Sequence, residues 1–232
     1  MLRVAAIHAA YGSVPVLNGI DLGLERGEIL ALLGRNGVGK TTLMRVLIGV
    51  LKATSGTIEL AGQEVSRLAP HRIAHLGIAY VPQGRGIFPR LSVLENLKVG
   101  TRARGDGKEI VPEEIFVYFP VLKARLTQTG GTLSGGEQQM LAFARALCGA
   151  PKVMLLDEPS EGIQPNIVQE LGRLIATFAS ERGIAVILVE QNIDLALQVA
   201  HRATIMEKGR IVHEGRPEEL RDEAVLRRYL AI

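Results

Sequence analysis

The stretch from Gly34 to Thr42, which reads GRNGVGKTT, decides the fold of this chain. Two glycines five positions apart are followed by a lysine and a hydroxyl residue, which is the pattern of a loop that holds phosphate groups. A continuous apolar run at 29–33 precedes the stretch and predicts a buried parallel strand. Behind it, apolar residues recur at helical spacing: Leu43, Val46, Leu47 and Val50. The context therefore predicts a strand, a loop and a helix in that order.

The physical chemistry of such a loop is anion binding. Glycines let backbone N–H groups converge on phosphate oxygens, and the following helix turns its unpaired N–H groups and the positive end of its dipole toward them. Lys40 then meets the β- and γ-phosphates of a nucleotide, and the Thr41 hydroxyl holds Mg²⁺. A glycine-rich turn with only a structural role is the alternative, and the matching flanks favour nucleotide binding.

Length and composition narrow the possible classes. The 232 residues and mass of 25.0 kDa suit a single domain with a sizeable core. Hydrophobic residues make up 47% of the chain, yet apolar runs such as 184–189 are far shorter than the roughly 20 residues that cross a bilayer. The first residues lack the pattern of an export signal, and a single cysteine, Cys148, agrees with a reducing cytosol. We therefore expect a cytoplasmic protein without a membrane span.

The net charge and the positions of the histidines argue against nucleic-acid binding and against a histidine metal site. The net charge of +3 is mild and the basic residues are scattered, so no nucleic-acid partner is expected. His71 and His75 are four positions apart but lack an evident third ligand. We interpret them as surface or core histidines rather than as a metal site.

The first part of the chain reads as short strands. Within 2–24, the apolar residues Ile20, Leu22 and Leu24 alternate with other residues after a turn at Tyr11-Gly12, which predicts an antiparallel strand pair. Residues 57–60 add a short strand, and 76–81 form another that Pro82 stops. Gln83 follows at the carboxyl end of that strand, the edge where open α/β sheets collect ligands. An amide there can coordinate a metal ion or orient a water molecule.

Between residues 84 and 131 the sequence changes to helical patterns. Ser92 and Glu95 fit a capping box, and Pro112 opens a second helical run after a glycine-rich loop at 105–107. We expect a small helical subdomain at about 85–150, inside one domain that spans 1–232.

Residues 133–138, which read LSGGEQ, begin a helix with one apolar face: Met140, Leu141, Ala144, Leu147 and Cys148. Ser134 and Glu137 can form a capping box, so the motif could exist only to start that helix. Gly135 and Gly136 argue otherwise, because each glycine in a helix costs up to about 1 kcal/mol relative to alanine. Bare backbone and one hydroxyl at a helix N-terminus form a second phosphate-binding surface.

An apolar run at 153–156 ends in two carboxylates, Asp157 and Glu158. In a chain with a phosphate loop, the first is placed to hold Mg²⁺ through its water and the second to polarise an attacking water. A solvated acidic strand end is the alternative. The neighbouring negative charges should disfavour ionisation of one of the two acids.

The last third of the chain alternates helices and strands. Residues 167–178 predict an amphipathic helix, and 184–189 a buried strand that exits into Glu190-Gln191-Asn192. Residues 204–214 resemble a hairpin, and 217–230 read as a charged helix.

These motifs, in this order and spacing, resemble the ATPase subunit of ATP-binding-cassette (ABC) transporters over essentially the whole chain. The resemblance implies an α/β fold with a phosphate-loop NTPase core, a mostly parallel sheet with flanking helices, together with an N-terminal antiparallel β subdomain and the helical subdomain. It implies hydrolysis of ATP to ADP and phosphate with Mg²⁺, at the inner face of the cell membrane. Two such subunits, either two copies or two relatives, would trap ATP between them and drive membrane permease subunits, which a solute-binding protein serves indirectly.

The resemblance also assigns roles by position. Tyr11 would stack on adenine. The cradle for phosphates and Mg²⁺ would comprise Gly34, Asn36, Gly37, Gly39, Lys40, Thr41 and Thr42. Ser134, Gly135 and Gly136 would reach the γ-phosphate that the opposite subunit holds. The metal ligands would be Thr41, Gln83 and Asp157, and the catalytic residues Glu158 as general base, Gln191 and Lys40.

Two positions depart from the usual pattern of the family. Gln191 stands where most members carry a switch histidine, and glutamine can donate a hydrogen bond but cannot carry a proton at neutral pH. Gln164 stands where many members place an aspartate before the proline. Val189-Glu190-Gln191, the stretch 81–85 and the compact length resemble importers of branched-chain amino acids and related amides. The stretches 161–165 and 33–39 are particularly similar to the urea and short-amide branch. The alternatives are an ATPase of lipid or lipopolysaccharide export, whose members usually keep the histidine, a non-transport ABC ATPase, and an inactive regulatory module.

Overall fold

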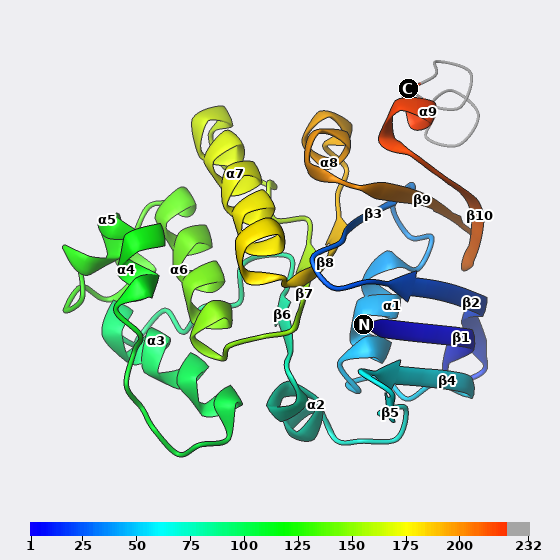
Figure 1. Ribbon diagram of the computed structural model, residues 1–232, viewed down its shortest axis with the longest axis horizontal. Coiled ribbons are helices and arrows are strands. Elements are labelled where there is room, and N and C mark those ends of the chain that lie inside the picture. The colour runs from blue at the N-terminus through cyan, green and yellow to red at the C-terminus, as the bar shows by residue number, and fades with distance from the viewer. Residues whose placement is uncertain (222–232) are drawn as a thin grey trace.

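The computed structural model describes residues 1–221 and is built around a sheet in the order β10-β9-β3-β8-β7-β6 (Figure 1). Its strands are β3 (Ile29–Leu33), β6 (Ile78–Val81), β7 (Val153–Asp157), β8 (Ala185–Val189), β9 (Arg202–Glu207) and β10 (Arg210–Gly215). All neighbours are parallel except β9 and β10, which form the predicted hairpin. Every residue of β3, β7 and β8 is buried, as expected for strands covered on both faces.

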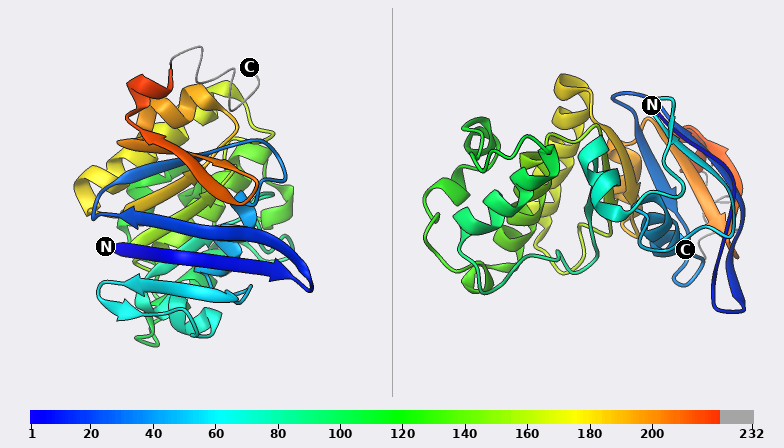
Figure 2. Two further views of the ribbon diagram at one scale, coloured as in Figure 1. Left: turned by 90° about the vertical axis from the view of Figure 1, so that its right-hand side faces the viewer. Right: turned by 90° about the horizontal axis from the view of Figure 1, so that it is seen from below.

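A second, antiparallel sheet forms one side of the molecule, in the order β2-β1-β4-β5 (Figure 2). Its strands are β1 (Leu2–Tyr11), β2 (Val14–Leu24), β4 (Ser55–Leu60) and β5 (Gln63–Glu64). Alternation along β2 buries Ile20, Leu22 and Leu24, which confirms the predicted strand pair.

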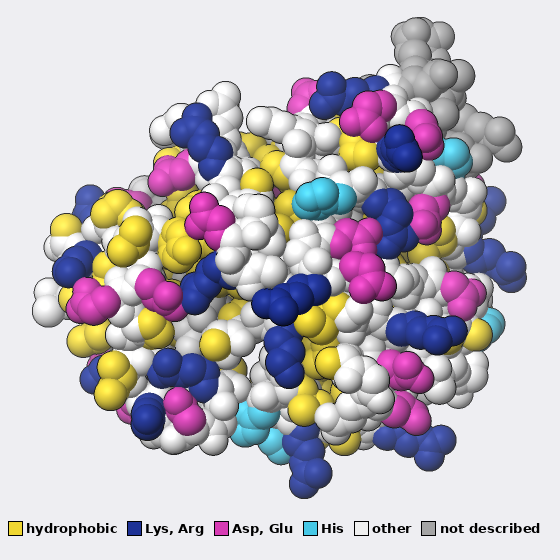
Figure 3. Space-filling model, in the orientation of Figure 1, with side chains coloured by type: hydrophobic (Ala, Val, Ile, Leu, Met, Phe, Trp, Pro, Cys, Tyr) yellow, Lys and Arg dark blue, Asp and Glu magenta, His cyan; other side chains and the backbone are white. Residues whose placement is uncertain are grey.

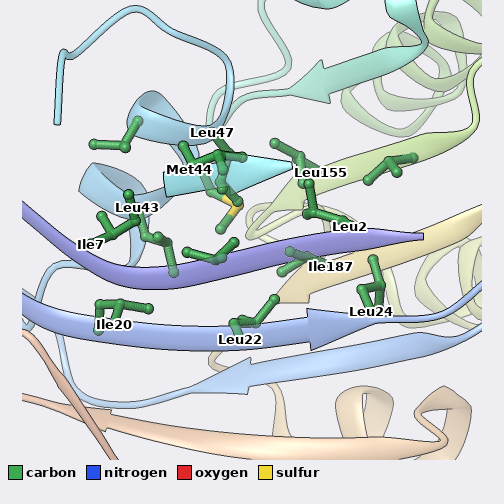
Figure 4. Close-up of a cluster of buried hydrophobic side chains, with 14 of the residues drawn as sticks. Leu2, Ile7, Ile20, Leu22, Leu24, Leu43, Met44, Leu47, Leu155 and Ile187 are labelled. Atoms are coloured by element: carbon green, nitrogen blue, oxygen red, sulfur yellow. The ribbon is translucent and has the colours of Figure 1, made fainter. Parts of the chain in front are cut away.

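Helix α1 (Lys40–Leu47) lies between the two sheets and joins them into one core (Figures 1 and 4). Leu43, Met44 and Leu47 of the helix face Ile20 of the antiparallel sheet and Ile187 of the main sheet (Figure 4). The prediction that Val50 shares this face is wrong. The helix ends at Leu47, and the side chain of Val50 is 60% exposed.

A second core lies on the other face of the main sheet. A group of helices covers it, at the end of the molecule away from the antiparallel sheet (Figures 1 and 2). These helices are α3 (Val93–Thr101), α4 (Glu114–Tyr118), α5 (Pro120–Lys123) and α6 (Gly135–Cys148), with short turns η1 (Arg102–Arg104) and η2 (Gly130–Thr132). Helix α2 (Pro70–Leu76) instead buries Ile73 in the first core. Helices α7 (Pro165–Arg182), α8 (Ile193–Val199) and α9 (Pro217–Leu220) complete the described fold. The central helix α6 buries apolar residues on most of its surface, more than the single predicted face.

Some predicted boundaries are wrong. The strand expected at 76–81 begins only at Ile78, because Leu76 closes α2 and Gly77 adopts a left-handed φ of 108°. The helix expected at 217–230 is described only as α9, and residues 222–230 lie outside the described part of the chain. Within residues 1–221, no helix has the length and apolar character that crossing a membrane requires. Acidic and basic side chains intermix on the face shown in Figure 3.

Candidate functional site

The loop between β3 and α1 leaves the start of α1 open to an anion. Gly39 is the N-cap, no side chain caps the helix, and its first turn contains no acidic residue. The N–H groups of that turn and the positive end of the helix dipole are therefore free to bind a negatively charged group. Gly34 has a φ of 146°, and a Cβ there would lie 2.4 Å from the carbonyl oxygen of Met206, so this position requires glycine.

A cavity of about 250 Å³ lies against this loop and collects most of the predicted nucleotide residues. Its lining comes from β2, the loop, α1 and the segments that follow β6, β7 and β8: Val16, Asn36, Gly37, Gly39, Lys40, Thr41, Thr42, Gln83, Glu158 and Gln191. The parallel strands bring these groups together because their carboxyl ends meet at one edge of the sheet. The cavity therefore combines the glycine loop and Lys40 with the Glu158 carboxylate and three side-chain amides, those of Asn36, Gln83 and Gln191.

Lys40 is buried at the base of this cavity. Its ammonium donates hydrogen bonds to the carbonyl oxygens of Gly34 at 2.6 Å and Arg35 at 3.0 Å. Burial lowers the pKa of Lys40, and the carboxylates of Glu158 and Asp157 oppose that shift. The cation is thus held in place by the same loop that would cradle a phosphate.

Glu158 is held by backbone and side-chain contacts. Its backbone N–H donates to the carbonyl oxygen of Val189 at 2.8 Å, and its φ of 50° lies in the left-handed region. The amides of Gln191 and Gln83 donate to Oε2 of Glu158 at 2.7 Å and 3.2 Å. A left-handed non-glycine residue costs of order 1 kcal/mol or more, and such conformations concentrate at functional sites.

Gln83 connects this carboxylate to the loop that follows it. Its Nε2 donates to Glu161 at 3.0 Å as well as to Glu158. Two residues further on, Arg85 donates to Gln138 of α6 at 2.9 Å and to the carbonyl oxygen of Gly162 at 3.4 Å. The segment after β6 therefore touches both the β7–α7 loop and the first turns of α6.

Asp157 lies beneath the cavity and is fully buried. The Tyr80 hydroxyl donates to its Oδ2 at 3.0 Å, whereas Oδ1 has no hydrogen-bond partner among residues 1–221. Burial raises the pKa of Asp157, Glu158 raises it further, and the hydroxyls of Thr41 and Tyr80 oppose the rise. The free oxygen of Asp157 and the nearby Thr41 hydroxyl are ligand types that suit Mg²⁺.

The predicted second phosphate surface lies elsewhere on the chain. Ser134, Gly135 and Gly136 line a different cavity, of about 520 Å³, together with Ile163 and Gln164. Figures 1 and 2 show α6 and α1 on opposite sides of the central strands. A single chain therefore does not bring the two surfaces together.

The capping box at the start of α6 is present. The Ser134 N–H donates to Glu137 at 2.8 Å, and the Glu137 N–H donates to the Ser134 hydroxyl at a longer 3.4 Å. A Cβ at Gly136 would lie 3.0 Å from Ile167, so packing against α7 explains one of the two glycines. The structural explanation therefore applies at this helix, and the phosphate-binding role of Ser134, Gly135 and Gly136 stays a prediction.

Tyr11 lies outside the cavity. Its side chain is 43% exposed, and its hydroxyl accepts a hydrogen bond from Arg45 at 3.2 Å. Arg45 lowers the pKa of Tyr11, because the guanidinium favours the phenolate. The exposed ring is available to a flat ligand, and the adenine role stays a prediction.

Sequence reasoning missed two buried contacts that shape this site. Glu190 is 2% exposed and accepts from the N–H groups of Ser160 at 2.9 Å and of Gln191 and Asn192 at 3.1 Å each. Glu190 thereby connects the loop after β8 to the loop after β7. An acidic residue directly after an apolar strand could have indicated this role from the sequence. The Tyr80–Asp157 hydrogen bond had no comparable signal, because it depends on how β6 and β7 align.

From the resemblance to ABC ATPases we predict that replacing Gln191 by alanine lowers the turnover of ATP by about ten- to a hundredfold, the value of one hydrogen bond to a charged group. The substitution removes the 2.7 Å contact that orients Glu158 and leaves the carboxylate itself in place. Turnover at saturating Mg²⁺ and ATP measures the effect. The control is Gln128→Ala, which removes a half-buried amide that is bonded to Thr132 and Arg125 and does not line the cavity. A complete loss of hydrolysis would contradict an orienting role.

Comparison with known proteins agrees with this geometry. The family model described as ABC transporter matches residues 17–161. The chain is 43% identical over 213 residues to the high-affinity branched-chain amino acid transport ATP-binding protein BraG of Pseudomonas aeruginosa, with 91% of each chain covered. It is 37% identical to the lipopolysaccharide export system ATP-binding protein LptB of Haemophilus influenzae, with 99% of this chain and 97% of the relative covered.

Solved structures show the same fold. The crystal structure of the ADP conformation of an ATP-binding cassette of an ABC transporter superposes with a TM-score of 0.84 at 27% identity, with 100% of this chain and 99% of that chain covered. This likeness confirms the predicted phosphate-loop α/β fold, and the match to the family model confirms the resemblance seen in the sequence. The chain therefore belongs to the ABC transporter family and is one of its ATPase subunits.

Proposed function

We propose that this chain hydrolyses ATP as one half of a two-subunit ATPase that drives import of branched-chain amino acids, or of urea and short amides, through a membrane permease. One observation carries the proposal. The groups for phosphate binding and hydrolysis line one cavity, whereas Ser134, Gly135 and Gly136 line another. A second copy or a related subunit, placed head to tail, would bring these three residues over the first cavity and complete it.

The chemistry within one cavity follows from its side chains. Lys40 binds the terminal phosphates as a fixed cation, and Thr42 and the N–H groups at the start of α1 hold the remaining oxygens. Tyr11, which lies outside the cavity, stacks on the base. Glu158 accepts the proton of the attacking water. Gln191 and Gln83 orient that carboxylate through the hydrogen bonds to its Oε2. A positioned base of this kind contributes about 10²- to 10⁴-fold to the rate.

We also propose Mg²⁺ as the cofactor, because the free Oδ1 of buried Asp157 and the adjacent Thr41 hydroxyl fit it. Gln83 is the third candidate ligand. When bound, the ion neutralises charge that develops on the phosphates.

A groove of about 360 Å³ offers a place for the permease. Its walls come from α2, β6, α3 and α6 and include the apolar side chains of Ile73, Tyr80 and Phe88 beside the Arg145 guanidinium. Phe88 is 44% exposed, and Arg145 stacks on its ring at 5.2 Å. We propose that residues of the helical subdomain at about 85–150 and the segment after Gln83 receive a cytoplasmic helix of the permease, which places this subunit at the inner face of the membrane.

The direction of transport and the solute class rest on similarity. Identity to the branched-chain amino acid protein is 43%, against 37% for the lipopolysaccharide export protein. Gln191 in place of the histidine also favours the import branch. The high coverage of the export protein keeps lipid or lipopolysaccharide export as the second candidate.

The test is to purify the chain with its permease and measure ATP hydrolysis in lipid nanodiscs. Branched-chain amino acids, urea and short amides should be added separately with the matching solute-binding protein, and one class should stimulate hydrolysis. The same complex carrying Glu158→Gln is the control. Stimulation by lipopolysaccharide alone would instead support the export candidate.

A further inference from the structure

The side chain of Tyr80 connects the candidate metal site with the groove on the other side of β6. Strands β6 and β7 are parallel, with Tyr80 opposite Leu155. Side chains alternate along a strand, so Leu155 and Asp157 of β7 lie on one face, the face that α1 covers. Tyr80 packs against the same core, and its phenol reaches diagonally across to Asp157, two positions beyond Leu155.

The hydrogen bond uses one of the two oxygens of Asp157. The Tyr80 hydroxyl donates to Oδ2 at 3.0 Å, and Oδ1 is left without a partner among the described residues. A fully buried carboxylate needs hydrogen bonds to stay in place, and a donor on one oxygen fixes the direction of the other. Outer contacts of this type orient metal ligands and commonly change metal affinity by about 10- to 100-fold.

Tyr80 at the same time lines the groove, as Ile73 and Phe88 do. The phenol therefore has its apolar part in the groove and its polar end on the carboxylate. We propose that Tyr80 is a positioning residue that holds the free oxygen of Asp157 toward the metal ion, from the wall of the groove. This inference rests on the proposed Mg²⁺ role of Asp157.

The substitution Tyr80→Phe deletes only the hydroxyl and keeps the ring in the groove. We expect the affinity of the ATP-loaded protein for Mn²⁺, used in place of Mg²⁺ and measured by electron paramagnetic resonance, to fall about tenfold. The Mg²⁺ concentration for half-maximal hydrolysis should rise by a similar factor, while kcat at saturating Mg²⁺ stays within about twofold, since Glu158 is untouched.

Tyr118→Phe is the matched control, because it deletes the same atom from a ring that packs edge-on against Phe178, in the helical part of the molecule. It should leave Mn²⁺ affinity unchanged. Circular dichroism of both variants verifies the fold. The positioning role of Tyr80 would be overturned if the parent and Tyr80→Phe bound Mn²⁺ equally well, or if Tyr80→Phe lowered kcat without changing the metal dependence. Either result would leave the proposed metal site standing. A parent protein whose Mn²⁺ binding does not depend on ATP would overturn the proposed metal site, and this inference with it.

Discussion

Glu158→Gln is expected to lower kcat for ATP hydrolysis by about 10²- to 10⁴-fold while ATP binding stays close to that of the parent. The amide has the shape of the carboxylate and retains an oxygen that can accept the 2.7 Å hydrogen bond from Gln191. It cannot accept a proton from water at neutral pH. The loss should therefore fall on the chemical step and leave the phosphate cradle intact.

Two measurements separate these effects. Single-turnover hydrolysis with radiolabelled ATP reports the chemical step, and titration calorimetry with ATP reports binding. Glu64→Gln, the same change at an exposed position on β5, is the charge-matched control and should match the parent in both. Turnover of Glu158→Gln within a few-fold of the parent would assign the base to another group.

The same variant tests the two-subunit proposal. Trapped ATP should hold two subunits together, because the cavity near Lys40 and the surface near Ser134 would then close over one nucleotide. Sedimentation of Glu158→Gln should show a dimer with ATP and a monomer with ADP. A monomer with both nucleotides would contradict the head-to-tail arrangement and leave the identity of the base untouched.

Local sequence patterns predicted the parts of this site that depend on chain neighbours. The strand at 29–33, the glycine loop and the start of α1 follow one another directly, so residue type and spacing were enough. Both capping boxes, at Ser92 and at Ser134, are likewise contacts between residues three apart. Alternation in β2 predicted its buried face for the same reason.

Contacts across the sheet were not predictable in this way. The bond from Tyr80 to Asp157 depends on the register of β6 against β7, and the bond from Gln83 to Glu161 depends on how two loops fold over the sheet edge. Neither is encoded in a short motif. The early end of α1, which exposes Val50, reflects the left-handed φ of 73° at Gly49, where a Cβ would lie 2.8 Å from Ile73. A glycine in the left-handed region just past the last helical turn commonly ends a helix, so this local signal outweighed the helical spacing of the apolar residues.

Lys40→Ala is expected to weaken ATP binding by about ten- to a hundredfold, the value of one hydrogen bond to a charged group. The Lys40 ammonium is buried and already fixed by the carbonyl oxygens of Gly34 and Arg35, so little ordering is needed when a phosphate arrives. Binding of adenosine, which has no phosphate, should be unaffected. Titration calorimetry of ATP and adenosine against the parent and the variant measures both.

Lys52→Ala supplies the matched control for this prediction. Its ammonium also donates to two backbone carbonyl oxygens, those of Arg67 at 3.2 Å and Leu68 at 3.1 Å, but it does not line the phosphate cavity. Lys40→Ala could weaken ATP binding only because the loop loses its hydrogen bonds to the lysine. In that case the midpoint temperature of thermal unfolding, measured without nucleotide, would be lower than in the parent. An unchanged midpoint with weak ATP binding assigns the effect to the missing charge. ATP affinity of Lys40→Ala equal to that of Lys52→Ala would show instead that the backbone N–H groups at the start of α1 bind the phosphates on their own.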